Sequence, residues 1–372
     1  MIKIVRIQNF KAFREAEINL SALNLFTGMN GMGKSSFIQS LLLLRQSDAG
    51  FIPEIQGLQL KGEMIDIGKG KDAQCIHADS DIISFEVDWE YKETVNVSYK
   101  FVAESDVLPF DISNEKNIVS GSDYSLFGNN FKYLKAERIA PEHNYKANLA
   151  AVQQKGFLGY RGENVPLYIA LNKLEPLKLD SVRHKNAIAN NLISNIDAWL
   201  NDITPGTHLI STYYNELDIV KIGYQFEHGK DVTPEFSPVN VGFGFTYTLP
   251  VLTTILSAKK GDLIIIENPE SHLHPQGQAK LGELIAKAAS DGVQLIIESH
   301  SDHLFNGIRV AIKNGFVKTD DVSVFYFIRN EASGEHLSTI EQPIIDSNGR
   351  ISHKPKGFFD EYSKLLDELI KS

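Results

Sequence analysis

Apolar and polar positions repeat with two different periods along the chain, and the changes of period mark the predicted elements. Residues 2–27 contain three short alternating segments, KIVRIQ, EAEINL and LNLFT, which predict strands. ISFEVDWE and TVNVSYKFVAE alternate in the same way and predict an antiparallel hairpin. Between these regions, the segment SSFIQSLLLLRQ is rich in leucine, lacks Gly and Pro, and predicts a helix.

The second half of the chain has the order strand, helix, strand. Two apolar runs, Leu263–Ile266 and Gln294–Ile297, predict buried strands, and the segment Gly277–Ala289 between them predicts a helix. This order is typical of a parallel sheet, so we expect an α/β protein. Apolar residues also recur at helical spacing within 185–200 and at the C-terminus: Ile188, Leu192, Ile196, Trp199 and Leu200, then Leu365, Leu366, Leu369 and Ile370.

The composition is that of an ordinary globular protein. With 372 residues, of which 42% are hydrophobic, the chain can bury a sizeable core. The net charge of -10 argues against nonspecific coating of nucleic acid, although DNA stays possible. A single cysteine, Cys75, excludes an intrachain disulfide, and we find neither a signal peptide nor an apolar run that could span a bilayer. We therefore expect a cytoplasmic protein with no membrane part.

The first candidate functional motif is GMNGMGKSS, which lies between a predicted strand and a predicted helix. Gly28, Gly31 and Gly33 let the backbone curl so that its N–H groups point at phosphate oxygens, and the helix N-terminus adds a positive dipole end. Lys34 can reach the β and γ phosphates, and Ser35 can offer its hydroxyl to Mg²⁺. The expected nucleotide contacts are Asn30, Gly31, Met32, Gly33, Lys34, Ser35 and Ser36.

The second half supplies further polar groups at predicted strand ends. Glu267 ends one buried strand and suits a Mg²⁺ held by oxygen ligands, while His300 follows the next strand. Asn240, Gly242 and Gly244 come immediately before an apolar helix and would present backbone amides at its N-terminus. A glycine turn that only caps the helix explains this last motif equally well.

Glu270, His272 and His274 have the residue types of a zinc site. Alternating residues on one extended segment rarely converge, and no cysteine supports them, so we favour a pH-sensitive or γ-phosphate-facing role.

Two charged groups also have a plain structural interpretation. Glu137 and Arg138 follow a predicted strand and could line a site, but a surface salt bridge between them is at least as well supported. The most basic patch is interpreted as a solvated strand edge in preference to a nucleic-acid contact: Lys3, Arg6, Lys11 and Arg14.

In this order the motifs resemble those of ABC-type P-loop ATPases of the bacterial AAA family, the branch that holds RecF, the SMC proteins and the overcoming-lysogenization-defect (OLD) ATPases. The resemblance covers most of the chain and is close to ATPases found near phage-defence genes. It is carried by GMNGMGKSS, NVGFGFTYTLP, IIIENPESHLHPQGQ, IIESHSDHLFNGIR and GRISHKPKGFFDE.

The resemblance implies an ABC-ATPase-like P-loop NTPase with a mixed central sheet, an antiparallel β subdomain and a helical lobe, folded as one domain over 1–372. Its expected parts are an N-terminal lobe with the P-loop at 1–100, an insertion or helical lobe at 101–237, a half with the signature, Walker B and switch histidine at 238–345, and a C-terminal helix at 346–372.

The resemblance also implies residue roles. Lys34 and Ser35 fall on Walker A, with Ser35 and Glu267 as Mg²⁺ ligands, and His300 falls on the switch histidine that senses the γ-phosphate. The signature loop that reaches across a dimer to the other subunit's ATP corresponds to Asn240, Gly242 and Gly244. Ser271 to Pro275 occupy the D-loop position, and Glu137 and Arg138 lie near the Q-loop position.

One departure from the family pattern affects the chemistry. The usual Walker B pair is Asp-Glu, whereas this chain has Glu267-Asn268. The Asn268 amide can orient a water molecule but cannot accept its proton. Because phosphoryl transfer depends mostly on positioning and charge neutralisation, we expect slow hydrolysis, with Glu270 as a substitute base.

The expected function is an ATP-dependent switch that binds ATP and Mg²⁺, forms a homodimer on ATP binding, and regulates DNA or an effector protein in phage defence. One alternative is a RecF-like repair or recombination ATPase. Another is an ATP-dependent scaffold that holds a toxin or nuclease partner from a neighbouring gene. The acidic composition favours a protein partner over DNA.

Overall fold

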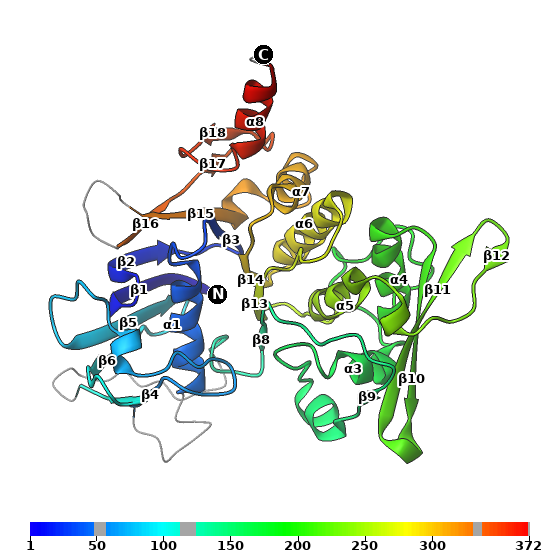
Figure 1. The fold of residues 1–372 in the computed structure, drawn as a ribbon, viewed down its shortest axis with the longest axis horizontal. Helices are drawn as coiled ribbons and strands as arrows, with labels where there is room; N and C mark the ends of the chain where they lie inside the picture. Colours follow the sequence, from blue (N-terminus) through cyan, green and yellow to red (C-terminus); the bar gives the residue numbers. More distant parts are fainter. Residues whose placement is uncertain (48–56, 112–123, 330–336, 371–372) are drawn as a thin grey trace. The chain divides into compact units, whose positions relative to one another are not determined.

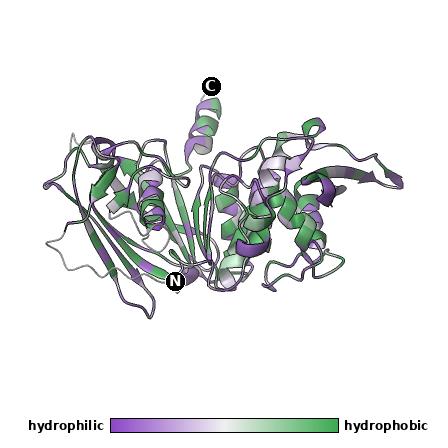
Figure 2. Ribbon diagram, turned by 90° about the horizontal axis from the view of Figure 1, so that it is seen from below, coloured by the Kyte–Doolittle hydropathy of each residue, from purple (hydrophilic) through white to green (hydrophobic). Residues whose placement is uncertain are grey.

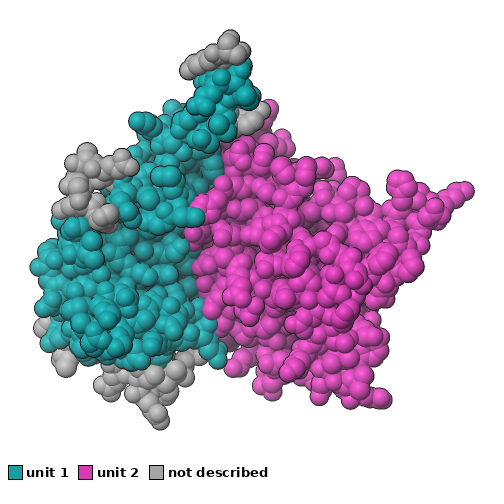
Figure 3. Space-filling view, viewed as in Figure 1, with its two compact units in different colours: residues 1–128, 322–372 teal, residues 129–321 magenta. Residues whose placement is uncertain are grey.

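The structure, a computed structural model, describes residues 1–47, 57–111, 124–329 and 337–370 (Figure 1). The chain divides into two compact units, coloured separately in Figure 3. Unit 1 comprises residues 1–128 and 322–372, and unit 2 comprises residues 129–321. Within the described part of the chain, no helix is both long enough and apolar enough to cross a membrane.

Unit 1 is mostly β structure with one long helix. Its strands are β1 Ile2–Phe10, β2 Phe13–Asn19, β3 Leu23–Gly28, β4 Gly57–Gln59, β5 Ile82–Trp89, β6 Val95–Lys100, β7 Val107–Pro109, β15 Val322–Arg329, β16 Ser338–Glu341, β17 Ile344–Ile345 and β18 Ile351–His353. Its helices are α1 Lys34–Gln46, α2 Gly70–Ala73 and α8 Glu361–Ile370.

Unit 2 combines a parallel sheet, an antiparallel sheet and most of the helices. Its strands are β8 Phe131–Leu134, β9 Tyr145–Lys146, β10 Thr207–Tyr214, β11 Ile219–His228, β12 Asp231–Val232, β13 Leu263–Glu267 and β14 Gln294–Glu298. Its main helices are α3 Val165–Asn172, α4 Leu192–Ile203, α5 Phe243–Leu256, α6 Pro275–Ser290 and α7 Asp302–Lys313.

Of the three strands predicted within residues 2–27, the first two are β1 and β2, which join β5 and β6 in an antiparallel sheet of order β2-β1-β5-β6. The hairpin predicted from ISFEVDWE and TVNVSYKFVAE is confirmed as β5 and β6. The strand-edge interpretation of the basic patch is wrong for β1, because β1 pairs on both sides. Arg6 on β1 contacts the carboxylates of Glu17, Glu86 and Asp88, so its charge is matched within the sheet.

A second, mixed sheet of unit 1 holds the strand that leads into the glycine loop. β3 pairs in parallel with β15, and β15 pairs antiparallel with β16. Phe26 on β3 packs its ring against Phe37 of α1 at 4.8 Å and against Phe325 of β15 at 5.1 Å. These fully buried rings anchor the strand before the loop to the helix after it.

In unit 2, β13 lies between β14 and β8 and pairs in parallel with both. The predicted helix between β13 and β14 is confirmed as α6, which packs on β14 and α7. The isoleucines 264, 265 and 266 of β13 are fully buried, which explains why the sequence shows a continuous apolar run there instead of an alternation.

The helix predicted over 185–200 begins later than its apolar spacing suggested. The structure starts α4 at Leu192, because Asn191 caps the helix by accepting a hydrogen bond from the Ser194 N–H. Ile188 therefore lies before the helix and is 96% exposed, so its place in the predicted stripe was wrong. The other members of that stripe are buried: Leu192, Ile196, Trp199 and Leu200.

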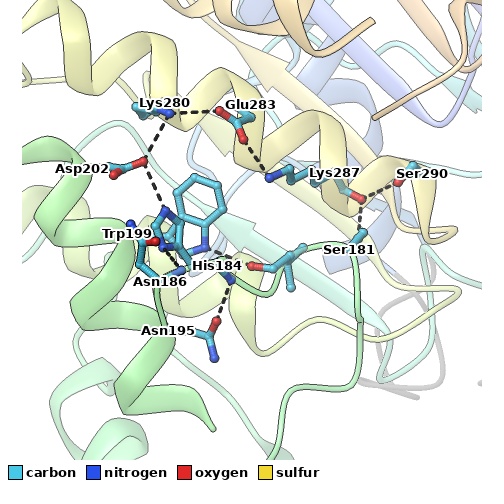
Figure 4. A network of polar contacts seen from close by, with 11 residues as sticks. Ser181, His184, Asn186, Asn195, Trp199, Asp202, Lys280, Glu283, Lys287 and Ser290 are labelled. Atoms are coloured by element: carbon cyan, nitrogen blue, oxygen red, sulfur yellow. Dashed lines mark hydrogen bonds and ion pairs between the residues drawn. The ribbon is translucent and has the colours of Figure 1, made fainter. Parts of the chain in front are cut away.

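A polar network joins α4 to α6 around the buried Trp199 (Figure 4). Lys287 of α6 lies over the Trp199 ring at 5.3 Å and pairs with Glu283 at 2.7 Å. Asp202 at the end of α4 contacts both Lys280 at 3.3 Å and His184 at 3.2 Å. The network fixes the helical part of unit 2 onto the helix that follows β13.

The C-terminal helix is confirmed as α8, and both hydrophobic and hydrophilic residues lie along it (Figure 2). Its apolar stripe is exposed: Leu365, Leu366, Leu369 and Ile370. The stripe therefore does not add to the buried core of unit 1.

Candidate functional site

The glycine loop of unit 1 has the backbone that its sequence predicts. Gly28, Gly31 and Gly33 have φ angles of 137°, 77° and 102°, which lie in the left-handed region that L side chains rarely adopt. A Cβ on Gly28 would lie 2.4 Å from the carbonyl oxygen of Phe327. The loop thus needs glycine for its conformation at all three positions and for close packing at Gly28.

The helix that follows the loop starts at Lys34 and can receive an anion. Gly33 is its N-cap, no side chain caps it, and its first turn contains no acidic residue. The buried Lys34 ammonium donates to the carbonyl oxygens of Gly28 at 2.9 Å and Met29 at 2.8 Å. A phosphate oxygen is a stronger acceptor than these neutral carbonyls, so Lys34 can exchange them for a nucleotide. Asn30 and Ser35 are exposed.

Two side chains from the mixed sheet hold the loop from outside, and the sequence analysis missed both. Ser338 on β16 donates to the Met32 carbonyl oxygen at 2.7 Å, and Arg329 on β15 donates to the Gly31 carbonyl oxygen at 3.0 Å. Both lie about 300 residues away along the chain, so no local motif marks them. These two hydrogen bonds hold the carbonyl groups of Gly31 and Met32 in fixed positions.

In unit 2, the Glu267 carboxylate at the end of β13 is held by two donors. The Tyr133 hydroxyl donates to Oε1 at 2.9 Å, and the backbone N–H of Ala136 donates to Oε2 at 3.1 Å. Two of the roughly four lone-pair positions of a carboxylate are thus used, which leaves acceptors for a hard cation. Tyr133 carries no local signal in the sequence beyond lying on a strand next to β13.

Asn268 directly follows Glu267, and its backbone has a φ of 45°. Asn is among the few residues that tolerate this left-handed conformation. Its N–H donates to the Glu298 carbonyl oxygen at 2.8 Å, which ties the ends of β13 and β14 together. Among the described residues, its buried Oδ1 has no hydrogen-bond partner and could accept from a water molecule.

Glu270, three residues after β13, lies beside His300, two residues after β14. The His300 backbone N–H donates to Glu270 Oε1 at 3.0 Å, while the His300 side chain is exposed. Burial raises the pKa of Glu270 above the ordinary value of 4.5, because it disfavours the charged form. A carboxyl whose pKa moves toward neutrality is better suited to accept a proton at neutral pH.

Arg138 is buried at the same strand ends, and the predicted salt bridge with Glu137 is wrong. Arg138 is 2% exposed and donates through Nη2 to the Glu267 carbonyl oxygen at 2.7 Å. Glu137 points elsewhere and pairs with Arg161 at 2.8 Å. Desolvation lowers the pKa of Arg138 to about 10, although the neighbouring Glu267 and Glu270 oppose this shift.

The proposed signature and D-loop segments contact each other in unit 2. Gly242 is the N-cap of α5, so Gly244 lies within its first turn, and Asn240 ends a short 3-10 helix, Pro238–Asn240. A Cβ on Gly244 would lie 2.8 Å from the His272 carbonyl oxygen. The exposed Phe243 ring lies 6.0 Å from the His272 ring.

The residues of the zinc interpretation have separate partners. Glu270 accepts from the His300 N–H, the His272 ring packs on Tyr247 at 4.5 Å, and His274 caps α6 by accepting from the Gln276 N–H. In the described ranges, no group of three or more His, Cys, Asp or Glu side chains is arranged to hold a metal ion.

The predicted site residues thus form two local groups. Unit 1 brings together the loop residues 30–36. Unit 2 brings together Glu267, Asn268, Glu270 and His300, to which the structure adds Tyr133 and Arg138, and it holds the signature segment beside His272. A strand, a loop of left-handed glycines and a helix that begins at the loop lysine define a P-loop nucleotide-binding protein.

The chain belongs to the family described as "AAA domain, putative AbiEii toxin, Type IV TA system", which matches residues 23–306. It is therefore a P-loop ATPase of the AAA type. A second family, described as "Protein of unknown function (DUF3696)", matches residues 317–369. A search of curated proteins finds no match.

Solved structures of SMC heads are similar to the chain. The SmcHead bound to the C-winged helix domain of ScpA has 13% identity and a TM-score of 0.52, and the match covers 92% of this chain and 97% of that one. The SMC head domain from Thermotoga maritima has 12% identity and a TM-score of 0.46, with 92% and 98% covered. The Smc head with an extended coiled coil, bound to the C-terminal domain of ScpA derived from Pyrococcus furiosus, has 12% identity and a TM-score of 0.49, with 99% of each chain covered. The first of these confirms the predicted fold class, an ABC-ATPase-like fold.

Proposed function

We propose that the protein is a slow ATPase that acts as an ATP-dependent switch. The observation that carries the proposal is the glycine loop, with its left-handed glycines, its uncapped helix start and the buried Lys34. This arrangement binds the phosphates of a nucleotide. Family membership supports ATP as that nucleotide.

Ser35, in the first turn of α1, and Glu267, at the end of β13, offer oxygen donors of the kind that Mg²⁺ prefers. We propose Ser35 and Glu267 as its protein ligands, because a hydroxyl and a carboxylate are hard donors. When bound, Mg²⁺ neutralises phosphate charge. Tyr133 and the Ala136 N–H hold the Glu267 carboxylate in one orientation, so that little rearrangement is needed on binding.

In the proposed hydrolysis step, Asn268 orients the attacking water and Glu270 accepts its proton. The unused acceptor atoms, Asn268 Oδ1 and Glu270 Oε2, support these roles. Because Asn268 cannot accept a proton and the substitute base, Glu270, lies two residues further along the chain, turnover is expected to be slow. His300, next to Glu270, would sense the γ-phosphate.

The switch itself is proposed to be a homodimer that closes on ATP. Asn240, Gly242 and Gly244 would contact the ATP of the second subunit, and the binding energy of this closed state would shift the equilibrium toward the dimer. The net charge of -10 and the ion-paired Arg6 favour a protein effector over DNA. The family description names a putative toxin and a Type IV TA system, which supports a toxin as the kind of effector involved. We propose a role in phage defence with it.

The proposal is tested by ATP binding and phosphate release at saturating Mg²⁺. We expect Lys34→Ala to abolish both, and Glu270→Gln to retain ATP binding but lower turnover about 100-fold or more, the size of effect typical of a general base. Lys71→Ala and Glu142→Gln, which change exposed residues in units 1 and 2, serve as controls. Unchanged turnover in Glu270→Gln would refute the role of Glu270, and unchanged ATP binding in Lys34→Ala would refute the whole proposal.

A further inference from the structure

A polar hollow of about 140 Å³ lies in unit 1, where the segment that leads into β5 meets the hairpin of β1 and β2. β1 contributes Gln8 and Asn9 to its lining, β2 contributes Arg14 and Glu15, and residues between 79 and 84 form another wall. One water molecule needs only about 10–15 Å³ of such space, so the hollow has room for a group of several heavy atoms.

Hydrogen-bond acceptors outnumber donors around Asn9, a residue that lines the hollow and is 4% exposed. Its Nδ2 lies 3.1 Å from Asp79 Oδ1, 3.0 Å from Ser80 Oγ and 2.9 Å from the Ile82 carbonyl oxygen. An amide nitrogen carries only two hydrogens, so these three acceptors have to share them. Among the described residues, the buried Asn9 Oδ1 has no hydrogen-bond partner. A ligand that donates to Asp79 would leave both Asn9 hydrogens for the other two acceptors.

The charge at the hollow favours a cation. Glu15 and Asp79 place two exposed carboxylates on its lining, and within the described ranges neither forms an ion pair. Arg14 adds one positive charge, so the balance of charge at the lining is negative. A divalent metal ion needs about six oxygen ligands around one point, whereas the part of the chain described here has no group of three or more His, Cys, Asp or Glu that could hold one. The lining thus suits an organic cation with several N–H donors.

We propose that the hollow binds a guanidinium group, supplied by an arginine side chain of a protein partner or by a free guanidinium compound. A guanidinium presents five N–H donors in one plane, so it can form paired hydrogen bonds with one carboxylate and donate to a second acceptor at the same time. An ammonium group offers its donors from a single point and lacks this geometry. The site goes beyond the proposed ATPase and does not depend on it, because its lining lies in unit 1 and includes none of the residues 28–36.

The test titrates N-acetyl-arginine amide into the nitrogen-15-labelled chain, without nucleotide, and follows the backbone amide signals by NMR. We expect saturable shifts at residues 8–15 and 79–84, with a dissociation constant in about the millimolar range, as suits a small ligand held by exposed ion pairs. A salt concentration of about 0.15 M screens distant charges. N-acetyl-lysine amide, which has the same charge, should bind severalfold more weakly.

Variants of the lining separate a specific site from general attraction. Asp79→Asn and Glu15→Gln should each weaken binding about threefold or more, and the double variant about tenfold. Asp81→Asn is the matched control, because this exposed carboxylate lies two residues from Asp79 but does not line the hollow, so it should change binding less than about 1.5-fold. Arg14→Gln removes the positive charge from the lining and should tighten binding, a gain that a folding defect would not produce.

Methylguanidine, which lacks the peptide groups, distinguishes the two sources of the guanidinium. Tighter binding of N-acetyl-arginine amide assigns the group to an arginine of a protein partner, and methylguanidine binding that is as tight or tighter assigns it to a free compound. A lack of saturable shifts at the hollow overturns the proposal. Equal weakening by Asp79→Asn and Asp81→Asn also overturns it, because the cation would then be attracted by the acidic surface in general.

Discussion

At the scale of single residues, the backbone conformation of Asn268 bears on the proposed Walker B pair, Glu267-Asn268. A glutamate at φ 45° would be strained, whereas asparagine tolerates the left-handed region. We expect Asn268→Ala to be less stable than Asn268→Gly by about 1 kcal/mol, because alanine carries the steric cost of a Cβ there. The free energies of unfolding in urea measure this difference, and equal stabilities would contradict the backbone argument.

A second prediction at this scale concerns Gly33. A Cβ at Gly33 would lie 2.4 Å from Ser338 Oγ. A residue with a side chain at this position would also have to adopt a φ of 102°. Gly33→Ala is therefore expected to displace the loop and weaken ATP binding about tenfold or more, by analogy with other strained backbone positions. Gly31→Ala is the control, because its φ is also positive but no atom lies within 4 Å of the added Cβ. If both variants lose the same amount of ATP affinity, backbone strain alone explains the effect, and the contact with Ser338 on β16 does not contribute.

At the scale of elements, we expect the contact of α4 with α6 to depend mainly on one aromatic side chain, Trp199. Trp199 is 1% exposed and is covered by Lys287, and its indole N–H donates to the Val182 carbonyl oxygen at 2.9 Å. Trp199→Ala should lower the free energy of unfolding by about 3–5 kcal/mol, through lost burial and a cavity.

The matched change in the same network is Lys280→Ala. The Lys280 side chain is 38% exposed, so its ion pairs with Asp202 and Glu283 are screened by water and should contribute less than about 1 kcal/mol. Chemical denaturation of both variants measures the contrast. A larger effect at Lys280 than at Trp199 would mean that charge, and not packing, joins the two helices.

At the scale of the whole molecule, the proposed switch predicts an ATP-dependent change of mass. Glu270→Gln, which is expected to slow hydrolysis, should form a dimer with ATP and Mg²⁺ but remain a monomer with ADP, as measured by light scattering after size exclusion.

Gly242→Glu tests whether the signature segment forms the dimer interface. Gly242 has an ordinary φ of -62°, and a Cβ there meets no atom within 4 Å, so this variant should keep its melting temperature while losing the dimer. Gly242→Ala, which adds only a methyl group, should retain part of the dimer. A Gly242→Glu variant that dimerises normally would show that the signature segment lies outside the interface.

Features that depend on neighbouring residues in the chain could be predicted without coordinates. The glycine loop, α6 and the buried strands β13 and β14 were all recognisable, because their spacing, capping and hydrophobicity lie within one continuous segment. Even there, the start of α4 was misplaced, since the cap at Asn191 overrode the apolar spacing that included Ile188.

The side chains that support the site could be identified only from long-range packing. Tyr133 and Arg138 reach Glu267 from more than 120 residues away, and Ser338 reaches Met32 from about 300 residues away. Such partners depend on how β8 pairs with β13 and how β16 joins β15, which no local pattern specifies. A hydrogen bond acts over about 3 Å of space whatever the separation in sequence, and for that reason these contacts became visible only in the folded chain.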